Sequence, residues 1–258
     1  MAAASIVFRD NGAYSRKLIK GAQTVFAFAR DGGKRRTYSR GNPYIEPYYN
    51  STGYYDEYMW SAAWLYYATG NVSYISLATN PGLSKNSKAL YDIPTTRALS
   101  WDNKLPAAML LLTRYRIFLN PGYPYEDMLH MYHNVTALTM CSYLKEFHYF
   151  NWTQGICQLV PLKNHQLIIL SDTSYSILYE FSKFLICHLA GGMIQLNLGK
   201  PQPLQYVANA AFLANLFADY LNATGVPGWK CGSKFFRSEF LRNFATSQVT
   251  SCSSHVIF

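Results

Sequence analysis

The sequence has 258 residues, enough for one large domain or two ordinary ones with a hydrophobic core. It is 50% hydrophobic, 16% aromatic and only 14% charged, a composition that can offset the entropy of ordering and so excludes intrinsic disorder. The formal net charge of +9 allows an anionic partner, but the sequence has no RNP, helix-turn-helix or zinc-finger pattern, so we predict no nucleic-acid partner.

The first predicted helix covers residues 13–30 and ends at Asp-Gly-Gly. Nine of the 23 basic residues lie between Arg9 and Arg40, where Lys34-Arg35-Arg36 is expected to form an exposed loop. The N-terminal residues are not predicted to form a signal peptide. No apolar stretch approaches the roughly 18 residues that a transmembrane helix needs, so we predict no membrane span.

Apolar residues at three- and four-residue spacing predict further helices at 56–69, up to about 78, 100–118, 125–144, 203–223 and 238–249. We expect Gly70 to end one helix, Asn71 to cap the next, and Ser100 to cap the helix that follows it. The helix at 203–223 is apolar nearly all round, which is typical of a larger helical assembly. Successive helices without an alternating strand series indicate an all-α array of helical hairpins. Residues 156–190 and 250–258 break this pattern.

The cysteines and the Asn-x-Ser/Thr sequons give information about the cellular compartment of the protein. The five cysteines form no Cys-x-x-Cys pair, so no zinc site is predicted; Cys141 and Cys231 could pair under oxidising conditions, but the sequence leaves the connectivity open. Five Asn-x-Ser/Thr sequons exceed the roughly two expected by chance and favour a secretory history. The predicted glycosylation sites are Asn50, Asn71, Asn134, Asn151 and Asn222.

One helix face carries Glu126, His130 and His133 at positions i, i+4 and i+7, which raises a metal site as a hypothesis. The spacing is not that of His-Glu-x-x-His and no further ligands cluster nearby, so we predict neither a metal nor a cofactor. The sequence also has no Gly-x-Ser-x-Gly, Walker or Gly-x-Gly-x-x-Gly motif, and nucleophilic serine or cysteine chemistry therefore has no support.

Aromatic residues beside carboxylates are the stronger signal. Ten Tyr and Trp residues lie in the 24 positions from Tyr44 to Tyr67, around Asp56 and Glu57, and a similar combination recurs at 101–102. Two interpretations remain open: the rings pack in a helical core, or they stack on the apolar faces of sugar rings while carboxylates accept sugar hydroxyls. For Trp64, core packing is the better interpretation.

Long blocks at residues 48–74, 99–129, 133–144 and 191–221, continued by GWKCG at 228–232 and LRNFATSQV at 241–249, closely resemble plant membrane-anchored endo-1,4-β-glucanases of the KORRIGAN type, in glycoside hydrolase family nine. The resemblance covers about 1–155 and 191–249 and implies a partial glycosidase catalytic domain, folded as an incomplete (α/α)6 barrel. It also implies a β-1,4-glucan substrate and a place in the secretory pathway or plasma membrane, facing the cell wall.

The catalytic residues that the resemblance implies do not occur here. An inverting glycosidase needs a carboxylate that activates water and a carboxylic acid that protonates the leaving oxygen. The family's base lies in an Asp-Ala-Gly-Asp motif and its acid follows a His-His-Arg-Gly segment, and neither motif occurs in this sequence. We therefore expect a truncated, inactive member with no catalytic residue. The alternatives are a noncatalytic glucan-binding remnant, a partner of an intact relative, or an enzyme with substitute carboxylates at Asp56 or Asp102.

The resemblance also implies which residues contact the sugar, and where the chain departs from its relatives. Pro201-Gln202-Pro203 occupies a region where many relatives have a Trp. Relatives run from the equivalent of Gly155 directly into that of Gly192, so residues 156–190 are interpreted as an insertion and 250–258 as an aberrant tail. The expected sugar contacts are Trp101, Asp102 and Tyr206, followed by Tyr54, Asp56, Glu57 and Trp60.

Overall fold

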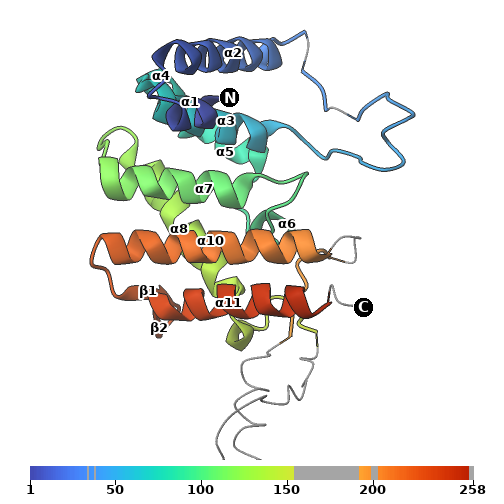
Figure 1. Cartoon of the computed structure of the whole chain (residues 1–258), viewed down its shortest axis with the longest axis vertical. Coiled ribbons are helices and arrows are strands. Elements are labelled where there is room, and N and C mark those ends of the chain that lie inside the picture. Colours follow the sequence, from blue (N-terminus) through green and yellow to red (C-terminus); the bar gives the residue numbers. More distant parts are fainter. Residues whose placement is uncertain (34, 38, 154–191, 199–202, 256–258) are drawn as a thin grey trace, which may run out of the picture.

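The computed structural model describes residues 1–33, 35–37, 39–153, 192–198 and 203–255. The elements are α1 Ala2–Val7, α2 Gly12–Arg30, α3 Tyr55–Thr69, α4 Val72–Ala78, α5 Pro81–Ser87, α6 Pro94–Arg97, α7 Leu105–Arg114, the π-helical turn η1 Tyr115–Leu119, α8 Glu126–Ser142, the 3-10 turn η2 Lys145–Phe147, α10 Pro203–Ala223, β1 Gly228–Cys231, β2 Lys234–Arg237 and α11 Ser238–His255. The helices stack in layers along the long axis, from α2 at one end to α10 and α11 near the other (Figure 1). The predicted all-α, incomplete barrel is confirmed. Among the described residues, no helix combines the length and apolarity that crossing a membrane requires.

Local signals place several helix ends correctly. Gly70 ends α3 in the left-handed conformation with φ 68°, which glycine adopts without steric cost, and the Asn71 side chain accepts from the Ser73 amide to cap α4. The expected cap at Ser100 is wrong, because α7 begins at Leu105. Residues 98–104 instead form a loop, held by the Asn103 side-chain amide, which donates to the carbonyls of residues 95 and 98.

Two other elements differ from the expectation. The predicted helix end at Val249 is wrong, because α11 continues to His255. A short hairpin, β1–β2, pairs Trp229 with Phe236, although no strand series was expected. Arg35 and Arg36 are exposed in a loop, as predicted.

The core divides at α7, whose side chains face two layers. Leu110 belongs to the cluster with α10 and α11, whereas Met109 belongs to the cluster with α3. In α10 one stripe, Val207, Ala211, Ala214 and Ala218, is buried, but Phe212 is 63% exposed. Most residues of α10 are buried or half-buried, and the helix packs against both α7 and α11. The expectation that it is enclosed on most sides therefore holds, except along the stripe that carries Phe212.

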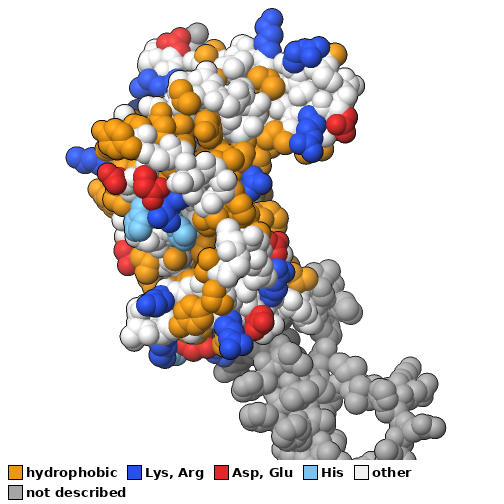
Figure 2. Space-filling model, turned by 90° about the vertical axis from the view of Figure 1, so that its left-hand side faces the viewer, with side chains coloured by type: hydrophobic (Ala, Val, Ile, Leu, Met, Phe, Trp, Pro, Cys, Tyr) orange, Lys and Arg blue, Asp and Glu red, His pale blue; other side chains and the backbone are white. Residues whose placement is uncertain are grey.

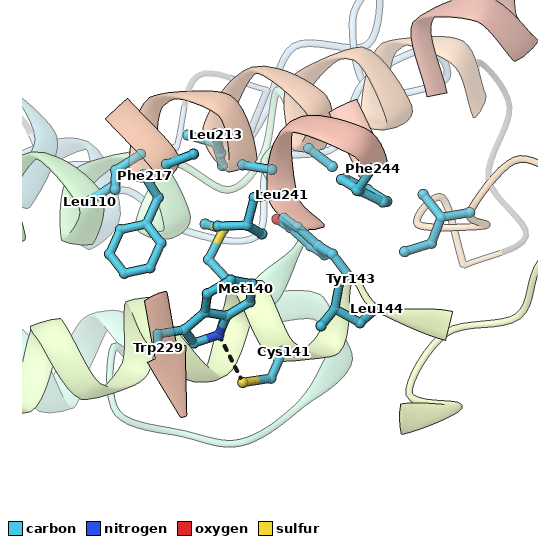
Figure 3. Close-up of a cluster of buried hydrophobic side chains, with 14 of the residues drawn as sticks. Leu110, Met140, Cys141, Tyr143, Leu144, Leu213, Phe217, Trp229, Leu241 and Phe244 are labelled. Carbon is cyan, nitrogen blue, oxygen red and sulfur yellow. Dashed lines mark hydrogen bonds between the residues drawn. The ribbon is translucent and has the colours of Figure 1, made fainter. Parts of the chain in front are cut away.

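A disulfide bond joins Cys141, in the last turn of α8, to Cys231 in β1, with the Cα atoms 5.7 Å apart. The Trp229 indole N–H donates to the Cys141 sulfur over 3.3 Å, and the indole lies against Phe217 with ring centroids 6.4 Å apart (Figure 3). The pairing that the sequence left open is thus formed, and it ties the hairpin to the α8 layer.

The two segments that flank residues 154–191 pair with each other. Trp152 and Ile194 form an antiparallel bridge, in which the Thr153 amide donates to the Met193 carbonyl over 2.8 Å. The side chain of Gln248, which is fully buried, accepts from the Ile194 amide and so fixes this bridge to α11. The chain ends that border the proposed insertion therefore meet in one place, whereas residues 156–190 themselves lie outside the described residues.

We expect deletion of residues 156–191 to leave the fold intact, because Gln154-Gly155-Gly192 would then form a short glycine-containing loop between the paired segments. The thermal midpoint should shift by less than about 4 °C, which corresponds to about 1 kcal/mol for a chain of this size. Circular dichroism on heating provides the measurement. In contrast, Gln248→Ala, which leaves buried backbone groups unpaired, should destabilise both forms. Loss of a cooperative transition on deletion would contradict the insertion hypothesis.

Candidate functional site

A groove of about 460 Å³ lies where the amino-terminal ends of α3, α7 and α10 meet. Residues 52–56, the loop around 95–105, and residues 196–198 form its walls. Of the seven residues expected to contact sugar, those that line the groove are Tyr54, Asp56, Asp102 and Tyr206. The helical stacking therefore brings to one surface residues as far apart in the sequence as Tyr54 and Tyr206.

Trp101 lies beside the groove in an open hollow of about 500 Å³, which it lines with Ile45, Tyr49 and Lys104. Its side chain is 56% exposed. Its carbonyl oxygen accepts hydrogen bonds from the Tyr49 hydroxyl and from the Lys104 ammonium, and the Tyr49 ring packs edge-on against the indole. Such a large aromatic surface held in solvent is suited to stacking on a ligand.

Asp102 joins the two walls of the groove. One carboxylate oxygen accepts from the Thr52 amide over 2.8 Å, and the other accepts from the Thr52 hydroxyl over 2.7 Å. Both oxygens are thus engaged within the protein, and the structure places Asp102 as a residue that positions the loop in front of α3.

Asp56 and Glu57 open α3 but differ in their surroundings. Asp56 is buried, and one of its oxygens accepts from the Lys104 amide over 2.7 Å, which fixes the start of α7. One carboxyl oxygen of Glu57 is buried and has no hydrogen-bond partner among the described residues. Burial, reinforced by the neighbouring Asp56, raises the pKa of Glu57 to about 8, so this carboxyl is neutral at pH 7.

Trp60 lies away from the groove lining. Its ring packs edge-on against Trp64 with centroids 5.6 Å apart, and it contacts both core clusters. Among the described residues, the candidate site therefore has two parts. One is the groove, which four of the expected residues line, and the other is Trp101 beside it.

Sequence reasoning missed Thr52, which anchors Asp102, and Tyr49, which orients Trp101. Tyr49 is one of the ten aromatic residues between Tyr44 and Tyr67, so the sequence pattern could have identified it as a site residue. Thr52 had no such signal, because its partner is 50 positions away.

Arg116 occupies the middle of the Glu126, His130 and His133 cluster. Its guanidinium lies 2.8 Å from the Glu126 carboxylate and 2.9 and 3.0 Å from the Nδ1 atoms of His133 and His130. Burial and Arg116 lower the pKa of His133 to about 4. Figure 2 shows histidine side chains beside basic and acidic ones on one face of the molecule. Among the described residues, no three His, Cys, Asp or Glu side chains are placed so that they could hold a metal ion.

All five sequon asparagines are exposed, as glycosylation would require. Two of them also accept hydrogen bonds: Asn71 from the Ser73 amide and Asn222 from the Ser238 hydroxyl. Their modification stays a prediction.

Comparisons with known proteins identify relatives of this chain. The family described as Glycosyl hydrolase family 9 matches residues 1–252. The sequence is 49% identical over 249 residues to Endoglucanase 7 of Arabidopsis thaliana and 52% identical over 249 residues to Endoglucanase 12 of Oryza sativa subsp. japonica. Each alignment covers 96% of this chain and 34% of the relative, so the chain spans about a third of the length of these curated relatives.

The fold is also similar to a solved structure, that of an endoglucanase from the termite Nasutitermes takasagoensis. The TM-score is 0.61 and the sequence identity 23%, over 96% of this chain and 41% of the termite chain. At this identity the likeness concerns the fold alone.

Proposed function

The chain belongs to glycosyl hydrolase family 9, and we propose on this basis that its groove binds a β-1,4-glucan as part of an endoglucanase-type domain. The observation that carries the proposal is the exposed Trp101 ring, fixed by Tyr49 at the edge of a groove that Tyr54 and Tyr206 line. Aromatic faces can stack on the apolar faces of pyranose rings, and the polar groups around them can bind sugar hydroxyls.

We further propose that these residues hold the sugar without supplying the catalytic carboxyl pair. The Asp-Ala-Gly-Asp motif does not occur in the 258 residues. Inversion needs two available carboxyl groups roughly 6.5 to 9.5 Å apart. In the groove region, however, Asp56 and Asp102 accept hydrogen bonds from backbone amides, so neither is free to activate water. The raised pKa of Glu57 would suit the acid of such a pair, but this acid has no free base beside it. The second candidate, an enzyme with substitute carboxylates, has no free pair to support it among these three.

The finer assignments are also proposals. The blocks that resemble KORRIGAN-type enzymes support a membrane-anchored relative, and the sequence Pro201-Gln202-Pro203 supports a weaker sugar subsite there. We propose that residues 1–155 and 191–249 form the partial glycosidase domain and that it associates with an intact relative.

Trp101→Ala tests the binding function. We expect retention of the purified chain on amorphous cellulose to fall about tenfold, which corresponds to about 1.4 kcal/mol. Phe28→Ala is the matched control, because it removes an exposed aromatic ring on α2, outside the groove lining. Absence of retention by the unaltered chain would contradict glucan binding.

An activity assay separates the two candidate functions. The purified chain should release no reducing ends from carboxymethyl cellulose. Release that Asp56→Asn or Asp102→Asn abolished would instead support the substitute carboxylates.

A further inference from the structure

A second hollow, of about 350 Å³, continues the groove at Asn197 and Leu198, which line both. Trp101 adjoins the groove at a different place, next to Asp102. None of the residues expected from the sequence to contact sugar lines this second hollow. Its lining consists of Pro94, Tyr149, Phe150, Asn151, Gln195, Asn197 and Leu198.

Tyr149 is the aromatic residue in this lining whose orientation is fixed by polar contacts. The Arg97 guanidinium lies over its ring, 4.6 Å from the centroid, and its hydroxyl donates to the Asp92 carboxylate over 2.7 Å. Arg97 is buried and pairs with Asp92 over 2.7 Å, so the three side chains brace one another. The ring therefore needs little ordering to receive a ligand, which lowers the entropic cost of binding.

The remaining polar groups in the hollow are side-chain amides. The backbone N–H of Gln195 donates to the backbone carbonyl of Asn151 over 2.8 Å. This pairing holds the two residues next to each other in the lining of the hollow. An amide can both donate and accept hydrogen bonds, as a hydroxyl can. None of the described residues in this lining carries a charge, so this part of the hollow suits a neutral ligand rich in hydroxyl groups.

We propose that Tyr149, with the side-chain amide of Gln195, forms an outlying sugar subsite through which the groove binds longer β-1,4-glucan chains. This inference rests on the proposed function of the groove. Tyr149 lines the hollow, so the part of its ring that Arg97 and the neighbouring Phe150 leave uncovered can contact a pyranose ring, and the side-chain amide can bind its hydroxyls. The subsite makes chain length a determinant of affinity.

The test compares β-1,4-linked glucose trimer and hexamer by isothermal titration calorimetry. The protein is produced in a host that adds no N-glycan, so that Asn151 carries no sugar of its own. Tyr149→Ala should weaken hexamer binding roughly three- to tenfold and leave trimer binding unchanged. Tyr149→Phe keeps the ring beneath Arg97 but loses the hydroxyl contact with Asp92, so it should lose less hexamer binding than Tyr149→Ala. Trp101→Ala should weaken both.

Gln195→Ala is the second variant, because this exposed side chain can be removed without disturbing the core. It too should weaken hexamer binding alone. Equal losses for trimer and hexamer, or no loss with either variant, would overturn the subsite while leaving the glucan groove in place. If the unaltered chain binds neither oligosaccharide, the proposed function fails and the subsite fails with it.

Discussion

Replacing Cys141 and Cys231 together by alanine is expected to lower the free energy of unfolding by about 4 kcal/mol. The bond spans a sequence separation of 90 residues, so its removal releases a long loop in the unfolded chain and increases the entropy of that state. Both side chains are buried, and alanine introduces no buried hydroxyl. Urea unfolding followed by tryptophan fluorescence measures the difference.

A reducing agent provides the control for this prediction. Dithiothreitol should shift the unfolding midpoint of the unaltered chain toward that of the double variant and leave the double variant unchanged. In the double variant the hairpin should loosen first, because the Trp229 indole loses its sulfur partner together with the disulfide bond. An unaltered chain that unfolds at the same urea concentration with and without reductant would contradict a stabilising role for the bond.

Helix ends that depend on neighbouring residues could be predicted, whereas those set by distant contacts could not. Gly70 and Asn71 act within one or two turns of their own helices, and both were found. Ser100 is a good cap by type, but the backbone amide of Lys104 is held by Asp56, 48 positions earlier in the sequence. That contact moves the start of α7, and no local pattern contains it.

The site could be predicted to a similar extent. The combination of aromatic residues and carboxylates identified the segments that form the groove, because the residue types that bind sugars are few. It did not identify what each carboxylate does, since the role of Asp102 depends on Thr52 across the groove. It also missed Tyr149, whose contacts with Arg97 and Asp92 exist only in the folded chain.

Glu57→Gln is expected to stabilise the chain above neutral pH by about 1 to 2 kcal/mol. The pKa of Glu57 is raised from 4.5 to about 8, so the native state binds this proton more tightly than the unfolded state does. Stability should therefore fall as pH rises from about 4.5 to 8, and the full cost of a buried charge remains above pH 8. The expected gain in the free energy of unfolding is smaller than the pKa shift alone would give, because solvent partly screens the Glu57 carboxylate. The Lys104 ammonium also offsets some of the cost of burying that charge.

Urea unfolding of the unaltered chain and of Glu57→Gln between pH 5 and 8.5 measures this effect. Glutamine cannot ionise, so the variant should lose most of the decline in stability that the unaltered chain shows over this range. Glu146→Gln is the matched control, because it removes the same charge from an exposed position. Equal slopes in the unaltered chain and in Glu57→Gln would mean that Glu57 is ionised in the native state. Glu57 would then be a carboxylate near the groove that could activate water, as the base of a substitute pair must.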